Sequence, residues 1–144
     1  MTTPNRSAPS KPLPRPANKA LSKPFWDAAK RHELVMQRCN ACSGWIFYPR
    51  EQCPVCFSQD LGWAPVSGRG RVYAFTIVHQ PGNPAFAGDS PYVFATIQLD
   101  EGVRVVSNVV GIDPHQVKVD MPVVAIYDDV SPEWTLVKFQ PAAS

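Results

Sequence analysis

A chain of 144 residues with 44% hydrophobic and 18% charged side chains can form one ordinary domain or two very small ones. Its longest uncharged apolar run, residues 72–78, is far shorter than the roughly 18 residues that a membrane-spanning helix requires. The N-terminus has no apolar block typical of a signal peptide, so we expect a cytoplasmic protein.

The charge is distributed unevenly. Residues 1–24 carry five basic side chains and no acidic one, whereas residues 66–144 hold five basic and eight acidic side chains, which gives −3. Because proline-rich polar segments bury too little apolar surface to offset their ordering entropy, we expect residues 1–22 to form a disordered basic tail. A solvated extension is the favoured interpretation, and contact with a partner or nucleic acid is the other.

The pattern changes around Pro24. Ser22 or Lys23 can cap a helix that has proline at an early position, and Phe25 and Trp26 follow before a charged stretch. This order predicts a short amphipathic helix. With the module that follows, it forms an expected unit of residues 23–65.

All four cysteines occur in two CxxC pairs, Cys39 with Cys42 and Cys53 with Cys56. A two-residue gap turns both thiolates of a pair toward one point, and two such turns joined by a hairpin make a tetrahedral four-sulfur site. With strands expected at 34–38 and 45–48, the pattern predicts a zinc ribbon rather than disulfides or a redox pair. Four protein ligands close the coordination shell, so the ion is expected to be structural.

Iron is the competing metal. The segment 53–56, Cys-Pro-Val-Cys, resembles a rubredoxin knuckle, which would make the protein an electron carrier. Zinc is favoured because thiolate sites bind it well and it needs no redox role.

Five apolar, β-branched runs separated by turn signals follow the ribbon. A tight turn at 100–102 indicates a hairpin between the second and third runs, and Asp113 with Pro114 predicts a short helix between the third and fourth. Three strands, a helix and two strands is the order of an OB-fold. We therefore predict a mainly β protein: an N-terminal helix, a rubredoxin-like zinc ribbon and a five-stranded OB-fold barrel over 66–141. The expected barrel strands are 71–79, 92–99, 103–110, 123–127 and 134–139.

The order of motifs along residues 22–141 resembles a known family, the zinc-ribbon plus OB-fold acyl-CoA-associated proteins, long catalogued as a domain of unknown function. The motifs are Phe25-Trp26, Leu34-Val35-Met36-Gln37-Arg38-Cys39, Tyr48-Pro49-Arg50, Cys53-Pro54, Ser67-Gly68-Arg69-Gly70-Arg71-Val72-Tyr73, Thr76, Pro91-Tyr92 and Phe139. The resemblance implies a non-catalytic auxiliary subunit of a thiolase-fold enzyme, such as a thiolase, an HMG-CoA synthase or a steroid side-chain aldolase, or of a MaoC-like enoyl-CoA hydratase. It also implies that the chain binds a CoA thioester, or shapes the pocket for one, while the partner supplies the catalytic groups.

Few residues of this chain could act in catalysis, because the cysteines are expected to hold metal. Of the histidines, His32 lies in a charged run typical of a solvated helix face, and His115 is expected on the surface of the short helix. The sequence pairs no nucleophile with a base, so we do not expect an autonomous enzyme.

A CoA thioester needs cations for its nucleotide end and an apolar channel for its arm. Arg69 and Arg71 flank Gly70 at the junction of ribbon and barrel and are the first candidates for the phosphates, with an exposed turn as the alternative. Phe25 and Trp26 are candidates to cover the acyl arm, although such a pair is more often core. His79, at the end of the first barrel strand, is a further candidate, with a histidine bonded to the backbone as the alternative.

Residues 80–91 form a long connection for a barrel hairpin, with Phe86 at its centre. Connections of this length without regular structure tend to be functional or mobile, so this one is a candidate lid or partner-docking element, with Phe86 as the docking residue. The alternative is a merely variable excursion.

The alternative function is single-stranded nucleic-acid binding, since zinc ribbons and OB-folds both serve that purpose. Tyr73, Phe75 and Phe94 could form a stacking platform. The −3 charge of residues 66–144 disfavours it, because phosphates would be repelled.

Overall fold

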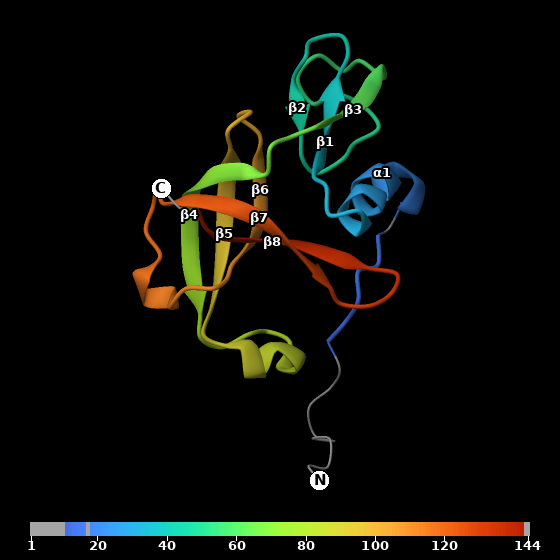
Figure 1. Ribbon diagram of the computed structural model, residues 1–144. Helices are drawn as coiled ribbons and strands as arrows, with labels where there is room; N and C mark the ends of the chain where they lie inside the picture. The colour runs from blue at the N-terminus through green and yellow to red at the C-terminus, as the bar shows by residue number, and fades with distance from the viewer. Residues whose placement is uncertain (1–10, 17, 143–144) are drawn as a thin grey trace.

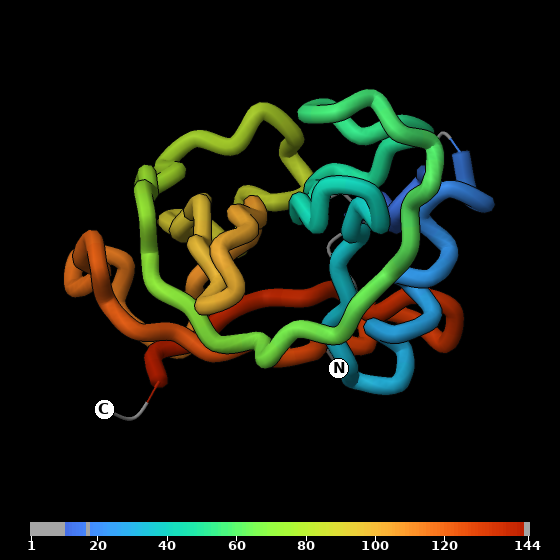
Figure 2. The backbone as a smooth tube through the Cα atoms, turned by 90° about the horizontal axis from the view of Figure 1, so that it is seen from above, coloured from blue at the N-terminus to red at the C-terminus, as the bar shows by residue number. Residues whose placement is uncertain are grey.

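The chain sets one helix and a small three-stranded sheet against a closed five-stranded barrel, in a computed structural model that describes residues 11–16 and 18–142 (Figure 1). Residues 1–10 of the expected tail lie outside the described residues. Figure 2 shows helix α1 (Lys19–Lys30) at one end of the molecule and residues 110–121, between two barrel strands, at the other. No helix within the described ranges is long and apolar enough to cross a membrane.

Helix α1 begins earlier than expected. Asn18, not Ser22 or Lys23, is the N-cap, and its Oδ1 accepts a hydrogen bond from the N–H of Leu21 at 3.2 Å. Pro24 consequently lies inside the helix rather than in its first turn. The helix tolerates it at the loss of one backbone hydrogen bond, because proline has no N–H to donate.

The ribbon sheet has the order β2-β1-β3. Strands β1 (Val35–Cys39) and β2 (Trp45–Ile46) lie where they were expected, although β2 is shorter. Strand β3 (Leu61–Pro65) was not expected, since its Leu-Gly-Trp-Ala-Pro sequence lacks β-branched residues. It pairs antiparallel with all of β1, from Val35 opposite Pro65 to Cys39 opposite Leu61, so the tertiary partner makes it a strand.

The barrel confirms the predicted fold class. Its strands are β4 (Arg69–Val78), β5 (Tyr92–Leu99), β6 (Arg104–Val109), β7 (Pro122–Asp129) and β8 (Thr135–Pro141). They close in the order β4-β5-β6-β8-β7, and the only parallel neighbours among them are β6 and β8, at Val109 and Phe139. The expected helix between β6 and β7 is a single 3-10 turn, η2 (Pro114–Gln116), capped by Asp113.

The connection between β4 and β5 contains a second 3-10 helix, η1 (Pro84–Asp89). The expectation of a connection without regular structure was therefore wrong. Asn83 caps the helix by accepting from the N–H of Ala85 at 2.9 Å, and Phe86 is half-buried in it.

Two hydrophobic clusters hold the fold together. The larger one fills the barrel and includes Met36 of β1 and Leu34 just before it, so the start of the ribbon is packed into the barrel core. The smaller one surrounds the cysteines at the far end of the ribbon and contains Cys39, Ile46 and Cys53. The ribbon is thus anchored to the barrel at one end and held by its own cluster at the other.

Candidate functional site

The four cysteine sulfurs converge on one point at the end of the ribbon. All four Sγ atoms lie within 4.8 Å of one another, with 3.5 Å between those of Cys39 and Cys56 and 3.7 Å between those of Cys42 and Cys53. Tetrahedral zinc with Zn–S bonds near 2.3 Å separates its sulfurs by about 3.8 Å. These distances fit four thiolates around one ion and are far too long for disulfide bonds.

Each CxxC turn directs a backbone N–H at the sulfur of its first cysteine. The N–H of Cys42 donates to Cys39 Sγ at 3.4 Å, and the N–H of Val55 donates to Cys53 Sγ at the same distance. Such donors stabilise a thiolate. The backbone N–H groups of Cys56 and then Val55 hold the pKa of the Cys53 thiol at about 6, and the N–H of Cys42 lowers the pKa of Cys39. These backbone donors favour the zinc-binding thiolate at Cys39 and Cys53, the first cysteine of each pair. The pKa values of Cys42 and Cys56 are raised instead, because their thiols share hydrogen bonds with those of Cys53 and Cys39.

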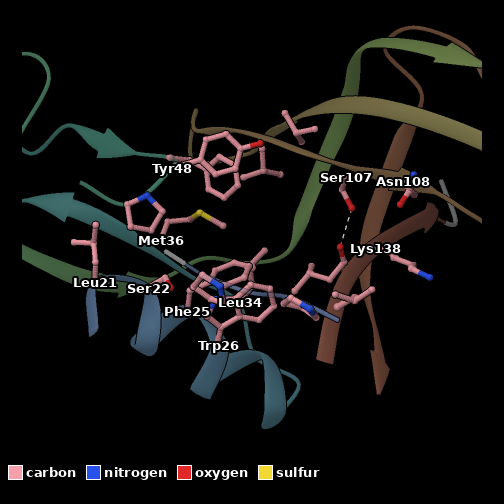
Figure 3. Close-up of a pocket in the computed structure, with 18 of the residues that line it drawn as sticks. Leu21, Ser22, Phe25, Trp26, Leu34, Met36, Tyr48, Ser107, Asn108 and Lys138 are labelled. Carbon is pink, nitrogen blue, oxygen red and sulfur yellow. Dashed lines mark hydrogen bonds between the residues drawn. The ribbon is translucent and has the colours of Figure 1, made fainter. Parts of the chain in front are cut away.

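A cavity of about 730 Å³ lies between α1, the ribbon and the barrel (Figure 3). Its walls are mainly apolar. The lining residues come from four parts of the chain: the segment before α1 (Pro14, Arg15, Pro16, Asn18), α1 itself (Leu21, Ser22, Phe25, Trp26), the ribbon (Leu34, Met36, Phe47, Tyr48, Pro49), and strands β6 and β8 (Val105, Val106, Ser107, Asn108, Leu136, Val137, Lys138, Phe139).

The face of α1 that lines the cavity follows helical periodicity. Its lining residues 18, 21, 22, 25 and 26 recur at intervals of three and four, which puts them on one stripe. Trp26 stacks edge-to-face on Trp134, with ring centroids 5.1 Å apart and planes at 87°. This contact fixes the helix against the end of the barrel.

Strands β6 and β8 form the opposite wall, where the barrel opens. Over residues 104–108, β6 pairs with β5 alone, and β8 joins it only at Val109. Side chains bridge part of the opening: Ser107 Oγ donates to the carbonyl of Val137 at 2.8 Å. Asn108 Nδ2 donates to the carbonyl of Val93, also at 2.8 Å. Most polar side chains in this wall are therefore engaged with the protein.

The structure brings some of the expected CoA-binding residues together and separates others. Phe25 and Trp26 both line the cavity, whereas Arg69, Arg71 and His79 are not among its lining residues. Arg71 Nη1 donates to the carbonyl of Asp120 at 3.0 Å, which ties its guanidinium to the turn before β7. Phe86, the expected docking residue, is also outside the cavity walls.

The barrel wall was missed by the sequence analysis, although a signal for it existed. Val105 and Val106 are adjacent valines in a strand whose successive side chains point to opposite faces. Apolar residues on both faces indicate a strand covered on both sides.

The aromatic platform expected for nucleic-acid binding is incomplete. Tyr73 and Phe94 are each 48% exposed, but Phe75 packs against the barrel core. The guanidinium carbon of Arg104 lies 3.8 Å above the Tyr73 ring and covers it. Nucleic-acid binding stays an untested alternative.

Comparison with known proteins matches both halves of the chain to one family. Residues 26–62 match the family described as "ChsH2, rubredoxin-like zinc ribbon domain", and residues 63–127 match "ChsH2, C-terminal OB-fold domain". A solved structure titled "Ltp2-ChsH2(DUF35) aldolase" is similar at 41% identity and a TM-score of 0.79. That match covers 90% of this chain and all of the other.

Two curated relatives carry different names. A "Probable enoyl-CoA hydratase alpha subunit" of Thermomonospora curvata is 42% identical over 129 residues, which are 90% of this chain and 40% of the relative. A "DUF35 domain-containing scaffold protein" of Methanocaldococcus jannaschii is 35% identical over 100 residues, which are 68% of this chain and 70% of the relative. The chain thus spans less than half the length of the hydratase subunit that it matches.

These matches confirm the resemblance drawn from the sequence motifs, and with the four clustered sulfurs they make zinc the cofactor of the ribbon. The chain belongs to the ChsH2/DUF35 family, in which a rubredoxin-like zinc ribbon precedes an OB-fold.

Proposed function

We propose that this chain is a non-catalytic accessory subunit that binds a CoA thioester, or shapes the site for one, and that a partner of thiolase fold or a hydratase supplies the reacting groups. The observation that carries the proposal is the apolar cavity of about 730 Å³. Its size and lining suit a long, mostly apolar ligand. The names of the similar proteins, an aldolase complex and a hydratase subunit, point to the same class of partner.

Within this proposal Phe25 and Trp26 form the apolar wall for the arm of the thioester. Both line the cavity from α1, and Trp26 is held there by Trp134. Their aromatic rings supply large apolar contact areas at a low cost in side-chain entropy.

The other expected binding residues stay proposals. Arg69 and Arg71 are exposed cations for the phosphates of the nucleotide end, although they lie outside the cavity. His79 is exposed and its ring centroid lies 6.1 Å from that of His115. Phe86 of η1 is the proposed contact with the partner.

The zinc ion has a structural part in this function. The residues that would hold it are the four cysteines, and a closed four-sulfur shell supplies folding energy rather than a reactive centre. What the ribbon contributes to the cavity is its side chains, among them Met36, Phe47 and Tyr48. The ion thus stabilises one wall of the proposed site.

The test is partner dependence. The purified chain is assayed with an enoyl-CoA and a 3-hydroxyacyl-CoA, and it is also isolated from its native host with whatever binds it. We expect no turnover by the chain alone and a stoichiometric thiolase-fold or hydratase polypeptide in the isolated complex. Turnover by the chain alone at enzyme-like rates contradicts the accessory role, and recovery of RNA in place of a protein favours the nucleic-acid alternative.

A further inference from the structure

We infer that Ser22 is the side chain through which the cavity hydrogen-bonds its ligand, and that this ligand presents a carbonyl oxygen to it. The inference rests on the proposed function and deepens it, because it names a recognition residue and the ligand group that it meets.

Ser22 is set apart by its hydroxyl. Within residues 11–16 and 18–142, its Oγ is the one buried side-chain polar atom that has no hydrogen-bond partner. A helical serine usually satisfies its hydroxyl by donating to the carbonyl four residues earlier, but Ser22 makes no such bond. A buried hydroxyl without a partner destabilises the protein, so a native structure that keeps one calls for an explanation.

The position of Ser22 supplies that explanation. It lines the cavity from the second turn of α1, on the same stripe as Phe25 and Trp26 (Figure 3). The hydroxyls and amides of the facing wall are already used, since Ser107 donates to Val137 and Asn108 donates to Val93. Ser22 thus lines the cavity while its Oγ is covered, and a rotation about χ1 brings the hydroxyl to an occupant that satisfies it.

The chemistry of the walls limits what that occupant is. Mainly apolar walls favour an uncharged segment of ligand, and a hydroxyl donor favours a carbonyl acceptor within it. A CoA thioester offers such acceptors in the two amides of its pantetheine arm and in the thioester itself. The edge of β6 over 104–108, which has a strand partner on one side only, favours the amides, because extended amide-bearing chains pair with strand edges.

The first measurement tests whether the hydroxyl lacks an internal partner. Thermal unfolding of the ligand-free chain is compared for wild type, Ser22→Ala and Ser107→Ala. We expect Ser22→Ala to leave the Tm unchanged or raise it, and Ser107→Ala to lower it, because only Ser107 loses a hydrogen bond within the protein. A fall in Tm for Ser22→Ala as large as that for Ser107→Ala overturns the inference.

The second measurement tests recognition and separates the two sources of the carbonyl. Calorimetric titrations use CoASH, octanoyl-CoA and the thioether S-octyl-CoA, which lacks the thioester carbonyl. We expect Ser22→Ala to weaken binding of all three about tenfold if the amides are the acceptors, and of octanoyl-CoA alone if the thioester is. Ser22→Thr keeps the hydroxyl and is expected to retain most of the affinity.

The outcomes separate a failure of the Ser22 inference from a failure of the proposed accessory function. Equal affinities of wild type and Ser22→Ala for every ligand overturn the role of Ser22 but leave the proposed function intact. Failure of the wild-type chain to bind any of the three overturns the inference too, while the accessory role is still judged by the isolated complex. Turnover by the chain alone contradicts the accessory role whatever Ser22 does.

Discussion

Gly70 of β4 is paired with both neighbouring strands of the barrel, β5 and β7. It lies opposite Leu99 of β5 and Val123 of β7. A Cβ atom on Gly70 would stand 2.4 Å from the carbonyl oxygen of Gln98, which is backbone and cannot rotate away. The sequence predicted that this glycine lies between Arg69 and Arg71 at a phosphate-binding junction, with an exposed turn as the alternative. Its absent side chain serves the closure of the barrel, because β5 occupies the space.

Replacing Gly70 by alanine is expected to lower the free energy of unfolding by about 1–3 kcal/mol, since the strands must separate to admit the methyl group. Urea denaturation monitored by tryptophan fluorescence measures the change. Gly82→Ala is the matched control, because no atom lies within 4 Å of its added Cβ. Equal midpoints for the two variants would contradict the packing role of Gly70.

At the scale of elements, the C-terminal end of α1 is joined to the barrel through His32. The residue has φ +59°, and the N–H groups of His32 and Glu33 donate to the carbonyls of Ala29 and Ala28, both at 2.9 Å, which ends the helix. The His32 ring stacks on Tyr127 of β7, with centroids 5.1 Å apart. His32 was expected on a solvated helix face, but it lies beyond the end of the helix, and its side chain, 50% exposed, is bound to the barrel.

Asp129, at the end of β7, is the hydrogen-bond acceptor where the end of α1 meets the barrel. Its carboxylate accepts hydrogen bonds from the Thr135 hydroxyl and from His32 Nε2, the latter at 3.0 Å. These two donors, Thr135 first, lower the pKa of Asp129. Because the folded state binds the proton more weakly than the unfolded state, the bonds stabilise the fold above the unfolded pKa of about 3.9.

Asp129→Asn should therefore be less stable than wild type at neutral pH, and the difference should shrink as the pH falls below about 4 and through the lower folded pKa of Asp129. Thermal unfolding between pH 2 and 7 provides the curve. Glu133→Gln, a change of charge in the following turn, serves as the control and should track wild type. A difference between Asp129→Asn and wild type that persists unchanged at low pH would contradict this origin.

The whole molecule has two centres of stability of unequal size. The larger cluster runs from β1 through the barrel and includes Leu34, Ile97 and Phe139, whereas the smaller one holds the cysteine end of the ribbon. A cluster of three buried residues is too small to offset the ordering of its loops, so the ion supplies much of the stabilisation there.

Removal of zinc by a chelator is consequently expected to open the ribbon without unfolding the barrel. Hydrogen exchange followed by mass spectrometry should show loss of protection at amides of residues 39–61 and retained protection in β4–β8. Adding zinc back should restore the lost protection. Retained protection at 39–61 after complete metal removal would show that the ion does not hold the ribbon.

Most of the architecture was predictable because its signals are local. The spacing of Cys39, Cys42, Cys53 and Cys56 acts over a few residues, and so does the alternation of apolar side chains that marks the barrel strands. One error arose where a distant partner decides the structure, because strand β3 exists through its pairing with β1. The start of the helix is decided locally by the Asn18 cap, a signal that was overlooked in favour of Ser22 or Lys23.

The cavity could not be found in the same way. Its walls combine Ser22, Tyr48, Ser107 and Lys138, which no local pattern links. In the barrel, the start of β4 lies beside β7, whereas β6 and β8 are paired only at Val109 and Phe139. Arg69 and Arg71 therefore lie at a different site from Phe25 and Trp26. Short-range chemistry was enough to predict the ion and the strands, because ligand spacing and side-chain alternation repeat within each segment. The cavity and its unpaired hydroxyl depend on which segments the folded barrel brings face to face.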